Sequence, residues 1–254
     1  MPMIYTHLVV VCCHATYKGG HPSDESSWIL QDFQRSDPST GKVGEHYTFH
    51  AHIFAGVRIL PQDPYSFLLF SGGKAQNMIN RKEAESYRLA FNNAHPYQLG
   101  VDMARVDVET NATDSFQNLL FSIVRFKQIV GKYPEKITVV THAFKERRFL
   151  ELHGPALKYP AHSLRVIGIN PPFTLEELQD VQKGELARGY EPFAKDLYGM
   201  SEPLNGKRRA RGWTGRKRKA LFGDLEGEVQ RLMEWRGGES GTEVFDETLP
   251  WEDL

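Results

Sequence analysis

With 254 residues, 40% of them hydrophobic and 25% charged, the chain has the size and composition of an ordinary globular protein with a substantial core. Its formal net charge of −1 excludes a global attraction to nucleic acids or to anionic membranes. No apolar run reaches the roughly 20 residues that span a bilayer, and the first residues lack the basic region and cleavage site of a secretory signal.

The first predicted strand covers residues 6–14 and contains both cysteines of the chain, Cys12 and Cys13. Two adjacent cysteines cannot form a disulfide framework, and their apolar neighbours favour buried, inert thiols. We therefore expect a cytoplasmic protein, because a reducing compartment keeps thiols free. Since no apolar run could span a bilayer, we expect no membrane partner. Residues 17–47 then form a long excursion, and loops of that length in compact domains are usually functional or disordered.

Strand-like and helix-like segments alternate up to about residue 170. Apolar runs rich in β-branched and aromatic residues predict further strands at residues 66–72, 104–109, 136–142 and 164–170. Helical spacing predicts helices at residues 50–60, 81–94 and 115–133, the last begun by Thr113 or Asp114 and ended by Gly131. Continuously apolar strands that alternate with helices are typical of a parallel sheet covered on both faces. We predict a three-layer α/β/α, Rossmann-like domain of about five strands over residues 1–172.

The pattern changes in the C-terminal part of the chain. Residues 173–236 predict a helical extension, and residues 207–219 within it form a basic stretch with eight cations and Trp213. Residues 237–254 are acidic and glycine-rich, which predicts a flexible tail. Near-zero net charge favours a basic surface patch that pairs with this tail over a nucleic-acid site. We therefore expect the basic stretch to be dispensable for small-molecule chemistry.

Polar and charged residues follow each predicted strand, where ligands of such sheets bind. Cations at the start of a helix oppose its dipole, so those after the fourth strand indicate an anionic ligand. The predicted acid–base residues are Glu109, His142 and His14. The predicted substrate-binding residues are Ser71, Gly72, Gly73, Lys74, Asn111, Thr113, Asn118, Thr141, Lys145, Arg147 and Arg148.

The turn that begins at Ser71 has two interpretations. Its glycines let the chain leave the sheet sharply, or its backbone N–H groups hold an anion at the start of the next helix. Because cations from a neighbouring loop are predicted at the same edge, we expect the second. A methyl group added at Gly72 would then block the anion.

Four sequence blocks in order resemble the domain-of-unknown-function family 218. They are FSGG, KEAESY, ETNATDSFQN and THAFKERRF, and the similarity covers residues 6–170. The resemblance implies a Rossmann-like domain of fungal type with site positions at Ser71, Gly72, Gly73, Glu83, Glu109, Thr113, Asn118, Thr141 and Arg148. It also admits S-adenosylmethionine or a nucleotide as ligand, although no cofactor is otherwise expected. The chain departs from the family where Lys145 replaces a usual histidine and His142 replaces a small residue.

The leading hypothesis is an intracellular enzyme that acts on a small anionic metabolite by general acid–base chemistry, with hydrolysis, elimination and isomerisation all open. The alternative is a non-catalytic protein that binds a nucleotide or an S-adenosylmethionine-type molecule. A metal hydrolase that uses His50, His52 and Glu83 or Glu85 is disfavoured, because an H-x-H pair on a helix points in two directions. We expect no metal, and a nucleic-acid partner is disfavoured by the net charge.

Overall fold

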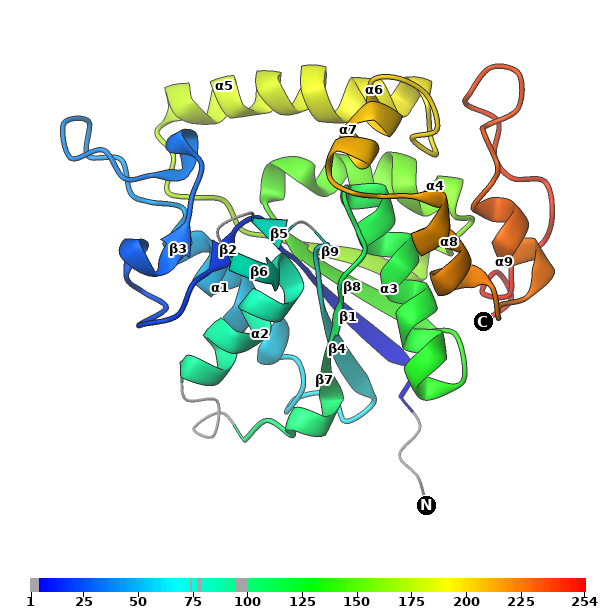
Figure 1. The fold of residues 1–254 in the computed structure, drawn as a ribbon, viewed down its shortest axis with the longest axis horizontal. Coiled ribbons are helices and arrows are strands. Elements are labelled where there is room, and N and C mark those ends of the chain that lie inside the picture. The colour runs from blue at the N-terminus through cyan, green and yellow to red at the C-terminus, as the bar shows by residue number, and fades with distance from the viewer. Residues whose placement is uncertain (1–4, 74, 77–78, 95–99) are drawn as a thin grey trace.

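The computed structural model of the protein describes residues 5–254 except 74, 77–78 and 95–99. At its centre lies a five-stranded sheet in the order β7-β4-β1-β8-β9, in which all neighbours are parallel. Helices cover both faces (Figure 1), which confirms the predicted three-layer, Rossmann-like fold. The strands are β1 (His7–Cys12), β4 (Ser66–Ser71), β7 (Val106–Glu109), β8 (Lys136–Thr141) and β9 (Leu164–Gly168).

The alternation of side chains along the central strand explains its uninterrupted apolar sequence. Leu8 and Val10 of β1 belong to the core on the side of α3 (Ser115–Val130), whereas Val9 and Val11 belong to the core on the opposite face. All six residues of β1 are buried. A strand that is covered on both faces must be apolar at every position.

The three predicted helices around the sheet are present, although each begins or ends a few residues away from its predicted limits. The side chain of Asp114 caps α3 by accepting a hydrogen bond from the N–H of Gln117 at 2.9 Å. Gly131 ends the helix at a φ of 87°, a left-handed conformation that favours glycine. The opposite face of the sheet is covered by α1 (His46–Val57) and α2 (Glu83–Asn93).

The excursion after β1 is folded onto the domain. Trp28 and Leu30 are buried, and the indole N–H of Trp28 donates to the carbonyl oxygen of Pro22 at 2.8 Å. One pair of short strands lies in this excursion, and a second pair lies in the turn before α2. They are the antiparallel pairs β2 (Thr16–Tyr17) with β3 (Trp28–Ile29), and β5 (Ala75–Gln76) with β6 (Ile79–Lys82).

The C-terminal extension is helical and packs on the sheet domain. A long helix runs along the top of the molecule in Figure 1, from α5 (Leu175–Glu185) through a π-helical segment (Leu186–Tyr190) into α6 (Glu191–Lys195). The other α-helices of the described residues are α4 (Gly154–Ala156), α7 (Leu204–Ala210), α8 (Gly215–Phe222) and α9 (Gly227–Leu232). No helix within the described ranges has the length and apolarity needed to cross a membrane.

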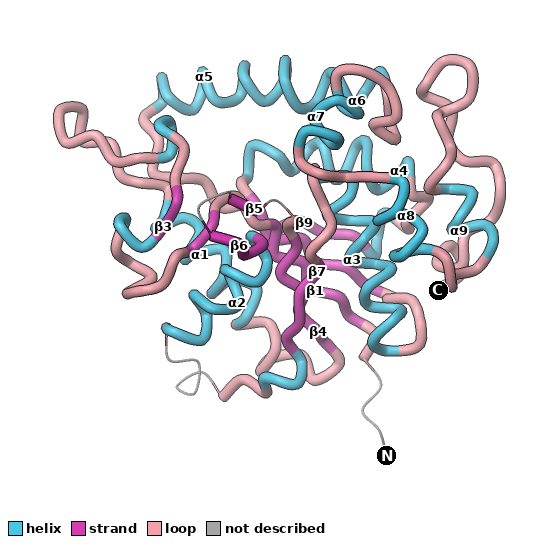
Figure 2. The backbone as a smooth tube through the Cα atoms, in the orientation of Figure 1, coloured by secondary structure: helices cyan, strands magenta, loops and turns pink. Residues whose placement is uncertain are grey.

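The last residues of the chain are packed, which corrects the predicted flexible tail over residues 237–254. Figure 2 shows this segment as loop, yet Phe245, Leu249 and Trp251 are buried in the same core as α3. The indole N–H of Trp251 donates to the carbonyl oxygen of Leu157 at 2.7 Å. The segment is acidic overall, but burial of these three apolar side chains holds it against the domain.

Candidate functional site

A cleft of about 460 Å³ lies at the carboxyl ends of the strands. Loops after β1 and β8, the start of α3 and the long helix that contains α5 supply its walls. Eight predicted site residues line it: His14, Gly72, Thr113, Asn118, Thr141, His142, Lys145 and Arg148. Lys74 lies outside the described residues, and five others are not part of the lining: Ser71, Gly73, Glu109, Asn111 and Arg147.

Lys145 enters the cleft from the short turn that follows β8. Its Nζ lies 3.3 Å from Nδ1 of His14, and no carboxylate of the described residues lies within ion-pair distance. Burial, followed by the charge of Arg148, lowers the pKa of Lys145 to about 8, although Glu185 opposes this shift. The amine therefore changes its protonation near neutral pH, where acid–base groups are most effective.

Three histidine rings gather beside this lysine. The ring of His142 lies 4.4 Å from that of His14 and 4.9 Å from that of His52, measured between centroids. His142 is only 3% exposed, and neither of its nitrogens has a hydrogen-bond partner among the described residues. Burial and the charge of Lys145 lower the pKa of His142 well below its usual value, so the ring is neutral. The carboxylate of Glu45 lies 3.8 Å from Nε2, beyond hydrogen-bond distance, so the ring keeps hydrogen-bonding capacity for a ligand in the cleft.

Arg148 and Glu185 join the sheet domain to the helix above the cleft. Their side chains form an ion pair at 3.2 Å and are 11% and 13% exposed. Arg148 begins a π-helical segment (Arg148–His153), and Glu185 directly precedes the second one. Single π-helical turns occur frequently at functional sites. The predicted cation Arg148 thus lines the cleft with its charge already paired.

Glu109 lies beneath the cleft, which corrects its predicted acid–base role. Its carboxylate accepts hydrogen bonds from the backbone N–H groups of Asn111 at 2.5 Å and Ala112 at 3.2 Å, and from the hydroxyl of Ser71 at 2.8 Å. The side chain is 1% exposed, and burial raises its pKa to about 6. Glu109 therefore orders the loop after β7 and does not face a ligand.

The N–H groups of Gly72 and Gly73 are not free, so these two glycines do not form the predicted anion cradle; Lys74, its last member, lies outside the described residues. The N–H of Gly72 donates to the carbonyl oxygen of Glu109 at 3.0 Å, and that of Gly73 donates to Ala112 at 2.7 Å. A Cβ at Gly72 would lie 2.8 Å from Cβ of Cys13. The glycines are needed because neighbouring chain segments approach closely there.

Two further predicted residues have local partners. Arg147 is 65% exposed and pairs with Glu151 one helical turn later at 2.9 Å, which corrects its predicted role in substrate binding. The side-chain amide of Asn118 lines the cleft and donates to the carbonyl and hydroxyl oxygens of Ser71 at 3.0 and 2.9 Å. Asn118 therefore fixes the end of β4 from the first turn of α3.

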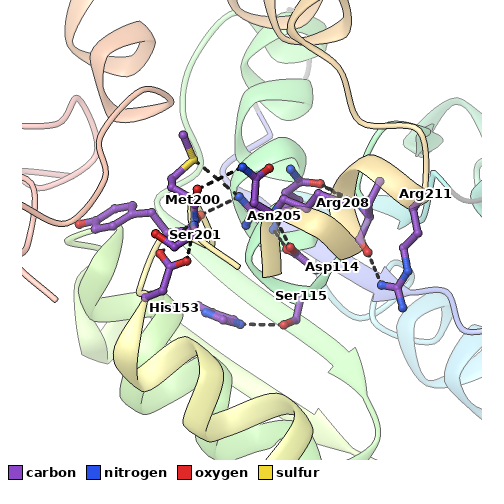
Figure 3. Close-up of polar contacts among 12 residues, drawn as sticks. Asp114, Ser115, His153, Met200, Ser201, Asn205, Arg208 and Arg211 are labelled. Atoms are coloured by element: carbon purple, nitrogen blue, oxygen red, sulfur yellow. Dashed lines mark hydrogen bonds and ion pairs between the residues drawn. The ribbon is translucent and has the colours of Figure 1, made fainter. Parts of the chain in front are cut away.

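The basic stretch reaches the cleft, contrary to its expected place on a separate surface. Figure 3 shows Arg208 against Asp114, with Nε 2.6 Å from the carboxylate, and Arg211 beside the start of α3. Arg208 is 3% exposed, and Arg211 lines the cleft while donating to the carbonyl oxygen of Thr113. Sequence gives no signal that separates a buried arginine from its exposed neighbours within a run of cations.

A serine–histidine pair that no sequence pattern predicts lies at the start of α3. Oγ of Ser115, in the cleft lining, lies 2.7 Å from Nε2 of His153 (Figure 3). Nδ1 of His153 has no partner among the described residues, and burial followed by the charges of Arg148 and Arg208 lowers its pKa well below the usual value. Serine catalysis needs a histidine that can hold a proton opposite a carboxylate. The pair lacks this third group, so we assign it a structural role.

No metal-binding cluster is present in the part of the chain that the structure describes: no three His, Cys, Asp or Glu side chains lie close enough together to coordinate an ion. His50 packs on the ring of Phe54, whereas His52 lies inside the fold with Nε2 2.8 Å from the carbonyl oxygen of Ile169. The two histidines therefore point in different directions, as predicted for an H-x-H pair on a helix.

The two cysteines line the cleft as thiols. Burial raises the pKa of Cys12 to about 12 and that of Cys13 well above its usual value. Only a thiolate is a strong nucleophile, so both groups are inert at neutral pH.

The fold and the cleft define an α/β protein with a Rossmann-like parallel sheet and a polar, cation-bearing cleft at its carboxyl edge. The chain is similar to a protein of Saccharomyces cerevisiae named "Uncharacterized protein YOR238W". The two are 27% identical over 250 residues, which covers 80% of this chain and 82% of the yeast protein. No family model matches the chain. No solved structure matches it either.

Proposed function

We propose that the protein is an enzyme that binds a small anionic metabolite in the cleft and acts on it by acid–base chemistry. One observation carries this proposal. Three cations that line the cleft, Lys145, Arg188 and Arg211, have no carboxylate within ion-pair distance among the described residues. Cations without a contacting carboxylate attract an anion, and of the carboxylates that also line the cleft, Asp114 and Glu185 are already paired with Arg208 and Arg148.

The acid–base role falls to Lys145 and His14 in place of Glu109. Burial, Lys145 and the neighbouring histidines lower the pKa of His14 well below its usual value, so its ring is a neutral acceptor. The amine beside it titrates near pH 8. The amine donates to Nδ1 of His14 and keeps further N–H donors for a bound ligand, so the pair can pass a proton between ligand and histidine in elimination, isomerisation or hydrolysis.

The alternative, a non-catalytic protein that binds a nucleotide or an S-adenosylmethionine-type molecule, is favoured by the burial of Glu109 beneath the cleft. Because Glu109 does not line the cleft, the carboxylate that was predicted to do acid–base chemistry cannot contact a ligand there. A turnover assay separates the two: an enzyme loses turnover in Lys145→Met, whereas a binding protein has none to lose.

A resemblance to family 218 and a cytoplasmic location belong to the same proposal. The resemblance is supported by the gathering of most of its implied positions at one sheet edge, and a fungal type by the yeast relative. The location is supported by two buried, unpaired thiols.

Thermal unfolding with phosphate, sulfate and citrate tests the proposal. Binding to the folded state raises the melting temperature with ligand concentration. We expect this gain in the parent and in Arg147→Ala, whose side chain lies outside the cleft lining, and at least tenfold weaker binding in Lys145→Met. No gain with any anion, or equal gains in all three proteins, contradicts the proposal.

A further inference from the structure

Lys145 differs from other lysines that pack on the fold. Lys132 lies 2.9 Å from Glu135, and Lys158 lies 2.9 Å from Glu252. Lys145 has instead a neutral histidine nitrogen at 3.3 Å. A carboxylate in direct contact favours the charged ammonium, so its absence favours the neutral amine, although Glu185 and Glu45 oppose this from a greater distance.

The cleft also removes water from this amine and places a second cation near it. Burial is the largest cause of the lowered pKa of Lys145, and the charge of Arg148 is the next. A pKa of about 8 makes the neutral amine on the order of a hundred times more abundant at pH 7 than in an ordinary lysine. Desolvation beside another cation is a known way to activate a lysine as a nucleophile.

His14 is oriented to exchange a proton with this amine. An ammonium group only donates, so Nδ1 of His14 accepts from Lys145 and Nε2 carries the ring proton. That N–H points to Oγ1 of Thr141, at 3.3 Å, which fixes the tautomer. A neutral imidazole nitrogen that can accept a proton thus faces the amine from within the same cleft.

We propose that Lys145 is the nucleophile of the cleft and forms an imine with the carbonyl group of a small aldehyde or ketone that also carries a carboxylate or phosphate. The inference rests on the proposed function, because it names the substrate class of the same site. Arg188 and Arg211, which line the cleft without carboxylate partners among the described residues, hold the anionic group.

The atoms balance without an oxidant or reductant. The nitrogen lone pair of Lys145 attacks the carbonyl carbon, and the electron pair of the C=O bond moves to oxygen. Nδ1 of His14 takes one proton from the ammonium before the attack and passes it to that oxygen afterwards, and it then moves a second proton from the nitrogen to the same oxygen. The C–O bond then breaks, water leaves, and a protonated C=N bond remains. This imine carries one positive charge, as the ammonium did, so the charge of the cleft is unchanged.

Reductive trapping tests the inference. The whole protein is incubated at pH 7 with pyruvate and sodium cyanoborohydride, which reduces an imine to a stable secondary amine, and adducts are located by peptide mass spectrometry. We expect Lys145 to be labelled at least tenfold faster than Lys132 in the same molecules. This internal comparison needs no variant, and Lys145→Arg keeps the charge while it removes the reactive amine.

Acetone provides the matched probe without an anionic group. We expect the ratio of Lys145 to Lys132 labelling to be at least tenfold higher with pyruvate than with acetone, and to fall in Arg188→Ala. Excess sulfate should slow labelling at Lys145 and leave Lys132 unchanged.

The outcomes separate the inference from the proposed function. Equal labelling of Lys145 and Lys132 overturns the inference, and the proposed function stands if anions still raise the melting temperature. Preferred labelling of Lys145 that is the same for acetone and pyruvate overturns the anionic substrate class. If neither labelling nor stabilisation occurs, both are overturned.

Discussion

At the scale of single residues, Lys145 brings an ammonium group into a buried cleft, and this lowers the stability of the fold. The pKa of about 8 in the folded state lies below the usual 10.5 of the unfolded chain. Below pH 8 both states carry the charge, and the folded state bears the full cost of burying it. Between pH 8 and 10.5 the unfolded state binds more protons, so the contribution of Lys145 to stability rises with pH.

Lys145→Met should therefore stabilise the protein at pH 7. The shift in pKa corresponds to roughly 3 kcal/mol, from which the lost contact with His14 subtracts, so we expect a gain of about 1–2 kcal/mol. The gain should shrink as the pH rises from 8 to above 10.5. Chemical denaturation of both proteins across this range measures it, and a gain that is constant with pH would show that Lys145 has an ordinary pKa.

At the scale of elements, the long helix over the cleft depends on one close approach. A Cβ at Gly189 would lie 2.7 Å from the carboxylate oxygens of Glu185 and 2.8 Å from the guanidinium of Arg148. Glycine at this position thus leaves room for the buried ion pair between the two walls of the cleft. Gly184, five residues earlier, would place its Cβ against the end of Arg188, an exposed side chain that can move.

Gly189→Ala and Gly184→Ala form a matched pair. Overpacking typically costs about 1–3 kcal/mol, so we expect Gly189→Ala to lose that much stability and to weaken anion binding. Gly184→Ala should be neutral or gain up to about 1 kcal/mol from helix propensity. Denaturation curves of both variants measure the stability, and the anion-dependent melting temperature of Gly189→Ala measures the binding. Equal losses of stability would mean that the ion pair does not need the space at Gly189.

The elements are also where sequence patterns are most informative. The apolar runs predict all five strands of the central sheet, and Asp114 and Gly131 predict the ends of α3, because these signals lie within a few residues of one another. The N–H groups of Gly72 and Gly73, in contrast, donate to carbonyl oxygens at the end of β7 and in the loop after it, far away in the sequence. A turn sequence alone therefore cannot tell an anion cradle from a site of close packing.

At the scale of the whole molecule, Arg208 fastens the C-terminal extension to the sheet domain. Its guanidinium contacts Asp114 at 2.6 Å and the carbonyl oxygen of Tyr198 at 2.6 Å. Asp114 uses its other oxygen to cap α3, so one carboxylate links the start of a core helix to the extension. The neighbouring Arg209 is 60% exposed and pairs with Glu202 at the surface.

Arg208→Ala should cost about 3–5 kcal/mol, because it leaves a partly buried carboxylate without its counter-charge. Arg209→Ala should change the stability by less than about 1 kcal/mol, as surface ion pairs do. Urea denaturation of the two variants measures the difference. Similar losses in both would mean that the extension is not held by the contact with Asp114.

The whole-molecule arrangement is what the sequence predicts least well. The composition of the basic stretch that contains Arg208 predicts a surface patch, and the composition of the acidic tail that contains Trp251 predicts a flexible segment. In both, one or two buried side chains decide the placement, and their partners are distant in the chain: Asp114 for Arg208, and Leu157 for Trp251. The location of the cleft was predictable because parallel strands bring their carboxyl ends to one edge.

The central claim is that the cleft binds a small anion at Lys145. The most direct measurement is an X-ray data set from crystals soaked in selenate, collected at the selenium absorption edge. The account predicts an anomalous peak inside the cleft, within about 3 Å of Nζ of Lys145, that is lost in Lys145→Met crystals. Peaks confined to arginines outside the cleft such as Arg147, or a peak near residue 145 that persists unchanged in Lys145→Met, would contradict it.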